Sequence, residues 1–337
     1  MLPRSKKILA LPNDICKAAG IRAFRGESEI NPVNIGAPPT GVLLSGGSGL
    51  IGHAVKQMLF ARRTSVLQLV RHSPFGTGQL KWDPVAAPIV ADESALEGLQ
   101  AAIHLSGASV VGRRWTPAYK RTMWMSRVQS TRALASTLSR LREPPRVLVV
   151  ASAVGIYGDR GDEILNESSS PGAGFLADVC KDWEAAAQLA QDAGIRVVHT
   201  RFGVVLGPGG GALSRMLPVF RLGLGGRLGS GRQWMSWVSL QDAAAAILLS
   251  MDSPGIAGAV NVTAPAPVTN ADFTKALARA VHRPAILHAP AFALRIALGE
   301  MSDEALLASA RVIPSKLTAA GFKFAHPTVE EALNSAI

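Results

Sequence analysis

The sequence is poor in cysteine, in aromatic side chains and in long apolar runs. Its 337 residues include two cysteines, Cys16 and Cys180, and aromatic residues make up only 5% of the chain. Two cysteines are too few for a disulfide framework, and neither has a histidine or cysteine neighbour at the spacing of zinc ligands. No apolar run approaches the roughly 18 residues that span a bilayer. We therefore expect a cytoplasmic protein with no transmembrane segment and no metal site.

Acidic residues are also few: 24 Asp and Glu stand against 35 Lys and Arg, which gives a formal net charge of +11. The basic residues are scattered along the chain, and no nucleic-acid-binding motif accompanies them. Pairs such as Arg62-Arg63 are more simply explained as solvated surface, and a phosphorylated small ligand accounts for a positive cleft equally well. We expect an unidentified small-molecule substrate, no nucleic-acid partner, and a monomer or a homodimer.

Residues 1–40 lack the apolar core of a secretory signal, although they carry many basic residues. Asp14, Glu27 and Glu29 count against a transit peptide, so organellar targeting stays an open alternative. The segment ends in Gly36-Ala37-Pro38-Pro39 and is expected to be a poorly structured extension. Attachment of this basic segment to a membrane surface is a further alternative.

Glycine, in contrast, is abundant, and one glycine-rich stretch carries most of the information. SGGSGLIG at 45–52 follows the apolar run Val42-Leu43-Leu44 and precedes an amphipathic segment over 54–61. A strand, a glycine turn and a helix in this order let the helix N-terminus hold a dinucleotide pyrophosphate. Gly46 suits the tight turn, Gly49 allows close approach of the backbone to phosphate, and Gly52 allows the helix to pack on the strand.

The rest of the chain alternates between strand-like and helical segments. Further strands are expected over 64–71, 101–106, 147–152 and 195–200, and helices over 117–141, 175–193, 242–251 and 270–281, the last with Asn270 as N-cap. A helix is also expected within 322–333. This pattern predicts an α/β fold: a doubly wound parallel Rossmann sheet in an NADP-binding domain over 41–205, with 236–265 packing back on it. Residues 206–337 would otherwise form a smaller C-terminal α/β substrate lobe.

The end of the second expected strand indicates which dinucleotide is bound. An NAD enzyme usually places an acidic residue there to bind the ribose 2′-hydroxyl, but this strand ends Leu69-Val70-Arg71-His72-Ser73. Arg71 is placed to bind a 2′-phosphate, and Ser73 could add a hydroxyl donor. A surface arginine is the alternative reading. We predict NADP(H) in preference to NAD(H), with Leu105, Gly107 and Ala108 beneath the nicotinamide-side ribose.

Longer motifs resemble one family. They include RRWTPAYK at 113–120, SRVQSTRAL at 126–134, SAVGIYG at 152–158, FLADVCKDWE at 175–184, RFGVVLGPGGGAL at 201–213, GGRLGSGRQWMSWVSLQD at 225–242 and GEMSDEALL at 299–307. From about residue 41 onward, the chain resembles an extended short-chain dehydrogenase/reductase of the epimerase-like, SDR39U1-type family. The resemblance implies a Rossmann domain with a small C-terminal lobe and bound NADP(H). The expected cofactor contacts are Gly46, Ser48, Gly49, Leu50, Ile51, Gly52, Arg71, Ser73, Leu105, Gly107, Ala108, Ser152 and Ala153.

The chain departs from the wider superfamily at the catalytic pair. In a Tyr-x-x-x-Lys arrangement counted back from Glu184, Leu176 stands where the tyrosine belongs and Cys180 where the lysine belongs. Lys181 comes one residue late, about 100° around a helix, and cannot simply substitute. The catalytic residues are therefore unknown, and the remaining candidates are Ser152, Tyr157, Cys180 and Glu184. Tyr157 and Cys180 also have plain structural readings, as a loop tyrosine and a packed thiol.

Four residues are candidates for binding substrate. Trp115 and Trp234 flank loops rich in glycine or arginine and could wall a pocket, or they could be part of a core. Arg201 and Arg232 could hold an anionic substrate, or they could be ion-paired or surface residues. We expect an NADP(H)-binding oxidoreductase or epimerase-like enzyme acting on an unknown small molecule. The alternative is a catalytically reduced protein that uses NADP(H) for binding or redox sensing.

Overall fold

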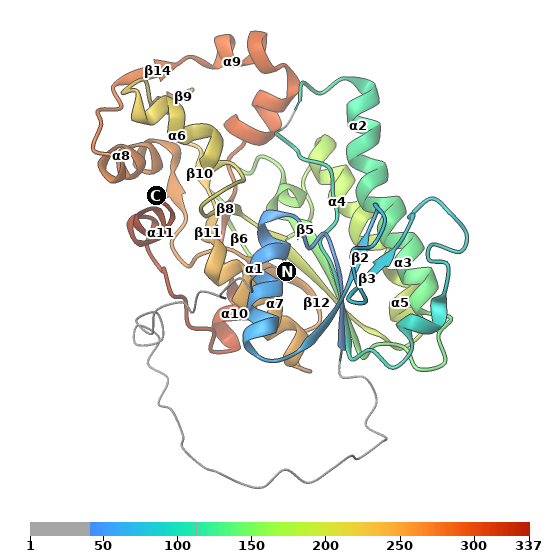
Figure 1. Cartoon of the computed structure of the whole chain (residues 1–337). Helices are drawn as coiled ribbons and strands as arrows, with labels where there is room; N and C mark the ends of the chain where they lie inside the picture. Colours follow the sequence, from blue (N-terminus) through green and yellow to red (C-terminus); the bar gives the residue numbers. More distant parts are fainter. Residues whose placement is uncertain (1–40, 112) are drawn as a thin grey trace, which may run out of the picture. The chain divides into compact units, whose positions relative to one another are not determined.

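The computed structural model describes residues 41–111 and 113–337, so the extension expected over 1–40 lies outside the described residues. Seven strands form one sheet in the order β12-β7-β5-β4-β1-β2-β3, and every neighbouring pair is parallel (Figure 1). The strands are β1 (Gly41–Ser45), β2 (Ser65–Val70), β3 (Gln79–Lys81), β4 (Ala101–His104), β5 (Val147–Ala153), β7 (Arg196–Phe202) and β12 (Gly258–Val262).

Helices cover the sheet on both faces (Figure 1). α1 and α7 pack against each other on one face, and α3, α4 and α5 lie on the other. Because both faces are covered, the central strands are continuously apolar, and Val147 to Val150 of β5 are all buried. The helices are α1 (Leu50–Ala61), α3 (Ser130–Leu138), α4 (Phe175–Ala185), α5 (Gln188–Asp192) and α7 (Leu240–Asp252). The predicted doubly wound Rossmann α/β fold is confirmed.

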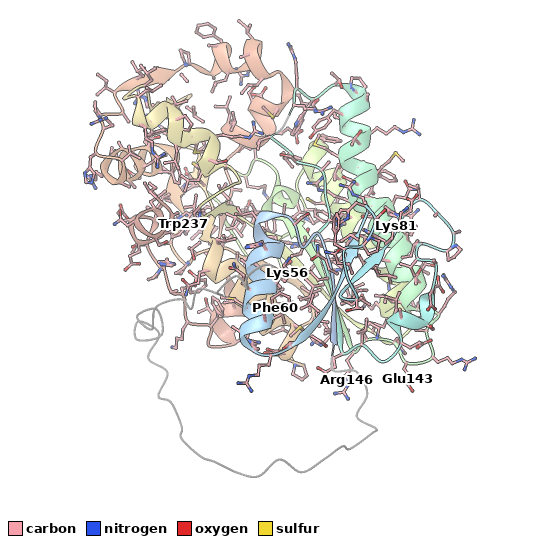
Figure 2. All side chains as sticks on the ribbon, viewed as in Figure 1. Lys56, Phe60, Lys81, Glu143, Arg146 and Trp237 are labelled. Atoms are coloured by element: carbon pink, nitrogen blue, oxygen red, sulfur yellow. The ribbon has the colours of Figure 1, made fainter. Side chains whose placement is uncertain are left out.

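A second apolar cluster forms beyond β7. Buried side chains from α6 (Leu213–Arg221), α8 (Asn270–Ala280) and α11 (Val329–Ala336) surround Trp237, which Figure 2 labels. Two elements from the range 236–265 belong to the main sheet region instead: strand β12 pairs with β7, and helix α7 packs on the sheet. The boundary expected at residue 205 stays a prediction.

Short strand pairs connect the parts of this second cluster and the loops around it. They are β8 (Val204–Leu206) with β11 (Trp237–Ser239), β9 (Gly226–Leu228) with β14 (Leu287–Ala289), β10 (Trp234–Met235) with β13 (Val268–Thr269), and β6 (Ile164–Leu165) with β15 (Arg311–Val312). The remaining helices are α2 (Pro117–Trp124), α9 (Ala291–Leu298) and α10 (Ser315–Ala319). In the described part of the chain, no helix is long and apolar enough to cross a bilayer.

Three local expectations differ from the structure. The helix expected over 117–141 is interrupted by a π-helical turn, Met125–Gln129, and the helix expected over 175–193 divides into α4 and α5. Asn270 is not the N-cap of α8: the Thr269 hydroxyl accepts the backbone N–H of Asp272, 3.2 Å away. Asn270 instead uses its Oδ1 to accept the N–H of Leu228, so its side chain connects α8 to β9.

Candidate functional site

The glycine loop after β1 can be built only with glycine at two positions. Gly46 has a φ of +73°, and a Cβ there would lie 2.7 Å from the carbonyl of Leu105. A Cβ on Gly52 would lie 2.2 Å from the carbonyl oxygen of Gly46. Both distances are well inside van der Waals contact, so side chains are excluded. The loop is therefore pressed against β4 on one side and against its own helix on the other.

The N-terminus of α1 presents free backbone donors. Gly49 is the N-cap and supplies no capping side chain, and the first turn contains no acidic residue. The first N–H groups of a helix have no intrahelical acceptors, and the helix dipole favours negative charge there. The backbone of Leu50 and Ile51 is therefore suited to an anion such as the pyrophosphate expected there.

The register of the sheet aligns the loops that follow three strands. Ser45 pairs with Leu69 of β2 and with His104 of β4, and its carbonyl accepts the N–H of Leu105 at 3.2 Å. Arg71 follows Leu69 by two residues, as Gly47 follows Ser45. Arg71 and Ser73 are both exposed. All three loops lie at the carboxyl edge of the parallel sheet, where such folds bind their ligands.

The π-helical turn holds the loop after β4. The Ser126 hydroxyl accepts the N–H of Ala108 at 3.0 Å, and Arg127 donates from Nη2 to the Ala108 carbonyl at 2.9 Å. Arg127 also donates to the Met123 carbonyl and lies over the Trp183 ring. Burial lowers the pKa of Arg127. Sequence reasoning missed both residues, although they belong to the SRVQSTRAL motif; a π turn at a functional loop is a recurrent device.

A buried histidine connects the ends of β1 and β4 to α3. His104 is fully buried; its Nδ1 lies 2.6 Å from the Ser45 hydroxyl and its Nε2 lies 3.1 Å from the Ser130 hydroxyl. Burial lowers the pKa of His104 to about 4, so the ring is neutral at pH 7 and has one donor and one acceptor nitrogen. Sequence reasoning also missed this bridge, which fixes Ser45, the residue directly before the glycine loop.

Three of the four catalytic candidates form one hydrogen-bonded chain. The Ser152 hydroxyl donates to Glu184 at 2.7 Å, and Arg201 donates to both carboxylate oxygens of Glu184 at 2.8 Å. Arg201 also donates to the Tyr157 hydroxyl at 2.9 Å, and Tyr157 donates to Asn261 at 2.7 Å. Arg201 and Glu184 form a buried ion pair with side chains 9% and 15% exposed. Of the two readings open for Arg201, the structure shows the ion-paired one.

The ion pair between Arg201 and Glu184 determines the protonation states within this hydrogen-bonded network. Burial would raise the pKa of Glu184, but the hydrogen bonds and charge of Arg201 outweigh burial and lower that pKa below its usual value. Burial would lower the pKa of Arg201, yet Glu184 raises it. Burial raises the pKa of Tyr157. At neutral pH Glu184 is therefore ionised, and it orients the Ser152 hydroxyl by accepting its hydrogen bond. Tyr157 keeps its proton.

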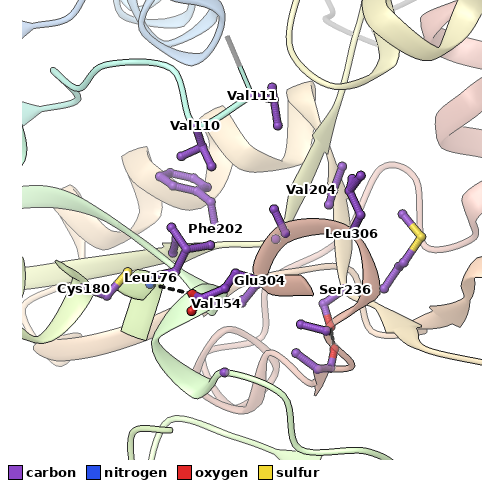
Figure 3. Close-up of a pocket in the computed structure, with 18 of the residues that line it drawn as sticks. Val110, Val111, Val154, Leu176, Cys180, Phe202, Val204, Ser236, Glu304 and Leu306 are labelled. Carbon is purple, nitrogen blue, oxygen red and sulfur yellow. Dashed lines mark hydrogen bonds between the residues drawn. The ribbon is translucent and has the colours of Figure 1, made fainter. Parts of the chain in front are cut away.

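Cys180 lies beside this chain without joining it. The thiol is 4% exposed, and burial, with a smaller contribution from the charge of Glu184, raises its pKa to about 12. The thiol is therefore protonated and a poor nucleophile at neutral pH. Leu176, one helical turn earlier on α4, points toward the same space (Figure 3). The positions expected for Tyr and Lys thus present an isobutyl group and a thiol, respectively.

A cavity of about 630 Å³ lies between Ser152 and Cys180 on one side and residues of the second apolar cluster on the other. Ser152, Ala153, Cys180 and Trp234 line it, and Figure 3 shows its apolar walls. Trp115 does not line the cavity: it packs with Met123 and Met301 and meets Phe175 edge to face. Arg232 is exposed and is also absent from the lining.

The described residues hold no group of three or more histidine, cysteine or acidic side chains that could bind a metal ion.

Residues 42–262 match the NAD dependent epimerase/dehydratase family, and residues 289–336 match a domain of unknown function, DUF1731. An epimerase family protein of Mycobacterium bovis is 46% identical over 295 residues, which is 88% of this chain and 97% of that protein.

Two solved structures are similar to this chain, each with 34% sequence identity. The human epimerase family protein SDR39U1 with NADPH is 34% identical with a TM-score of 0.80, over 87% of this chain and 97% of that one. A nucleoside-diphosphate sugar epimerase from Corynebacterium glutamicum is 34% identical with a TM-score of 0.71, over 88% of this chain and 59% of that one. The resemblance noted in the sequence is confirmed, and the chain belongs to the NAD dependent epimerase/dehydratase family.

Proposed function

We propose that the protein is an NADP(H)-binding oxidoreductase or epimerase-like enzyme that acts on a small molecule in the cavity beside Ser152. The observation that carries the proposal is the glycine cradle: Gly46 and Gly52 leave no room for a side chain, and the N-cap of α1, Gly49, provides no capping side chain. A tight loop that ends in free backbone donors is the arrangement that a bound pyrophosphate requires. The human relative, whose structure contains NADPH, supports the same reading.

Several residues at the carboxyl edge of the sheet would contact a bound dinucleotide. The backbone of Gly49, Leu50 and Ile51 would hold the pyrophosphate, Arg71 and Ser73 the 2′-phosphate, and the loop Leu105–Ala108 the nicotinamide-side ribose. When bound, the nicotinamide ring supplies or accepts a hydride. Ser152 and Ala153 lie where β5 ends, at the same edge of the sheet, and both line the cavity.

The protein's own polar contact with the substrate would centre on Ser152, whose hydroxyl proton is donated to Glu184 and whose oxygen can accept a hydrogen bond from the substrate. Glu184 is held ionised by Arg201 and so positions the Ser152 hydroxyl without donating a proton itself. Tyr157 is fully buried and hydrogen-bonds away from the cavity, to Asn261. Ser152 and Cys180 are the two candidates that line the cavity and carry a proton, and we assign substrate contact to Ser152 and packing to Cys180.

Preference for NADP(H) is tested by titrating the protein with NADPH and NADH and following nicotinamide fluorescence. NADPH should bind at least tenfold tighter, because a charge-assisted hydrogen bond contributes about 1.5–3 kcal/mol. Arg71→Ala should remove most of that difference and leave NADH binding unchanged. Arg132→Ala, at another exposed arginine on α3, is the matched control. Equal affinity for the two nucleotides in the unmodified protein would overturn the preference.

A second candidate function rests on the substituted catalytic positions. Because Leu176 and the protonated Cys180 stand where a tyrosine and a lysine belong, the protein could instead use NADP(H) as a redox-sensing ligand. This function predicts that NADP⁺ and NADPH protect different sites from limited proteolysis and retain different binding partners. Identical digestion patterns and identical partners with both forms would exclude it.

A further inference from the structure

The cavity beside Ser152 is lined mostly by apolar residues. Its walls come from several elements that are distant in sequence, and they include Val110, Val204, Met216, Leu228, Met235 and Leu306. Figure 3 shows several of these side chains pointing into one space from different ribbons. Such a wall gains free energy by covering apolar ligand surface, and it offers few hydrogen bonds to a polar ligand.

The carboxylates in the lining are already occupied. Both oxygens of Glu304 accept backbone N–H groups at the start of α4, from Phe175 and Leu176. Asp159 accepts the N–H groups of Gly161 and Ser309. Asp303 is ion-paired with Arg295. Each of these three acids therefore already has at least one hydrogen-bonded or ion-paired partner within the protein.

The positive charge in the lining lies on the cofactor side. Among the described residues that line the cavity, Arg127 is the one cation. Its guanidinium donates to the carbonyls of Ala108 and Met123, so it is committed to the loop after β4. Arg311 stacks on the Trp234 ring, 4.2 Å from its centroid, but does not itself line the cavity. Among the described residues that line the cavity, none at its substrate end is a cation that could neutralise a phosphate.

We infer that the substrate is a predominantly apolar, uncharged small molecule with one polar group directed at Ser152. The inference rests on the proposed function and names the substrate class of the same site. A nucleotide sugar, the kind of substrate that the name of the Corynebacterium relative gives, carries a diphosphate, and a buried diphosphate is commonly held by bidentate arginine, by lysine or by the backbone N–H groups of a helix N-terminus. Away from the loop after β4, the described lining residues include no arginine or lysine that could make such a contact.

The test is a displacement titration with N-phenyl-1-naphthylamine, a neutral fluorescent apolar probe. Linear methyl ketones from 2-butanone to 2-decanone serve as competitors, and UDP-glucose is the polar competitor. Each set is run without cofactor and with saturating NADP⁺, which cannot reduce a ketone. Affinity should rise about fourfold for each added methylene until the cavity is filled. UDP-glucose should not displace the probe at millimolar concentration.

Two substitutions on α6 locate the binding site. Met216 lines the cavity, whereas Val219 is on the same helix, 46% exposed and outside the lining. Met216→Gln should weaken the longer ketones at least fivefold, and Val219→Gln should leave them unchanged. Because Met216→Gln could also disturb folding, NADP⁺ affinity is measured for each variant, and Met216→Leu should restore ketone binding.

The outcomes separate the two proposals. An affinity that does not depend on chain length, or displacement of the probe by UDP-glucose at lower concentrations than by 2-octanone, overturns the inference about the substrate. Equal ketone binding by the Met216→Gln and Val219→Gln variants overturns it as well. Failure to bind NADP(H) overturns the proposed function, while the titration without cofactor still decides the character of the cavity.

Discussion

Ser152 and Glu184, which are 32 positions apart in the chain, are joined by a 2.7 Å hydrogen bond from hydroxyl to carboxylate. The same carboxylate is held by Arg201, so the orientation of a hydroxyl at the cavity depends on a buried ion pair. We expect the free energy of unfolding to depend strongly on this ion pair. Removing one member of a buried pair leaves the other charge uncompensated.

Glu184→Gln is therefore expected to lower the free energy of unfolding by about 3 kcal/mol. The glutamine can still accept from Ser152 but leaves the Arg201 guanidinium without a counter-charge. Urea denaturation followed by fluorescence measures the change. Glu163→Gln is the matched control, because its ion pair with Arg160 is half exposed and should be worth less than about 1 kcal/mol.

The double variant Glu184→Gln/Arg201→Gln sharpens this prediction. Since the uncompensated charge is gone, the double variant should be destabilised by less than the sum of the two single variants. Additive losses would mean that the two residues stabilise the fold independently, and the coupling inferred from their geometry would be wrong.

The glycine cradle makes a second prediction. Gly52→Ala places a Cβ against the carbonyl oxygen of Gly46, and the strain should cost about 1–3 kcal/mol of stability. Displacement of the loop should also weaken NADPH binding at least a hundredfold, measured by nicotinamide fluorescence. At Gly76 a Cβ would meet no atom within 4 Å, so Gly76→Ala should change neither property. Normal NADPH affinity in the Gly52→Ala variant would contradict the assignment of this loop.

The stability of the fold should also depend on His104 between pH 4 and pH 6.5. In the folded state its pKa is lowered to about 4, against about 6.5 in the unfolded chain. Between these values only the unfolded chain binds the proton, so stability falls as the pH drops and is constant above pH 6.5. The loss amounts to about 3 kcal/mol at pH 4.

Urea denaturation at pH 7, 6, 5 and 4 measures this slope, and His104→Gln should reduce it. Some slope should remain, because burial also lowers the pKa of His199. His53→Gln, at an exposed histidine on α1, should have the unmodified slope. If the His104→Gln variant and the unmodified protein lose stability in parallel, the neutral bridge between Ser45 and Ser130 is not the cause.

The sequence predicted the parts of the site that depend on local pattern. An apolar strand, a glycine turn and an amphipathic helix are encoded within about 20 residues, so the loop around Gly46 could be placed with its flanking elements. The central strands could be predicted because strands buried on both faces are continuously apolar. The sequence alone also shows that no acidic residue directly follows β2. It shows as well that Leu176 and Cys180 replace the expected tyrosine and lysine.

Contacts across long separations could not be predicted. His104 is 59 residues from Ser45, and nothing in the sequence around it distinguishes a bridge from an ordinary core histidine. The π turn at Met125–Gln129 has the same apolar periodicity as the helices on either side, so a single helix was the simplest reading. At Thr269 and Asn270, both residue types cap helices well, and only the contact between Asn270 and Leu228 decides which one does.

Arg127 offers the last prediction, because it connects the missed π turn to cofactor binding. Its planar guanidinium donates to two carbonyls at once, those of Ala108 and Met123, and a lysine ammonium cannot reproduce this geometry from the same backbone position. Arg127→Lys should release the loop after β4 and weaken NADPH binding about tenfold. Nicotinamide fluorescence measures the affinity, and urea denaturation should show a loss of about 1–2 kcal/mol.

Arg121→Lys, at an exposed arginine on α2, is the matched control and should change neither quantity. Ser126→Ala removes the acceptor for the Ala108 N–H in the same loop and should weaken NADPH binding in the same direction, because Ser126 and Arg127 hold the two peptide groups that flank Ala108. If Arg127→Lys loses stability while NADPH affinity is unchanged, the guanidinium stabilises the packing against Trp183 and does not position the cofactor loop.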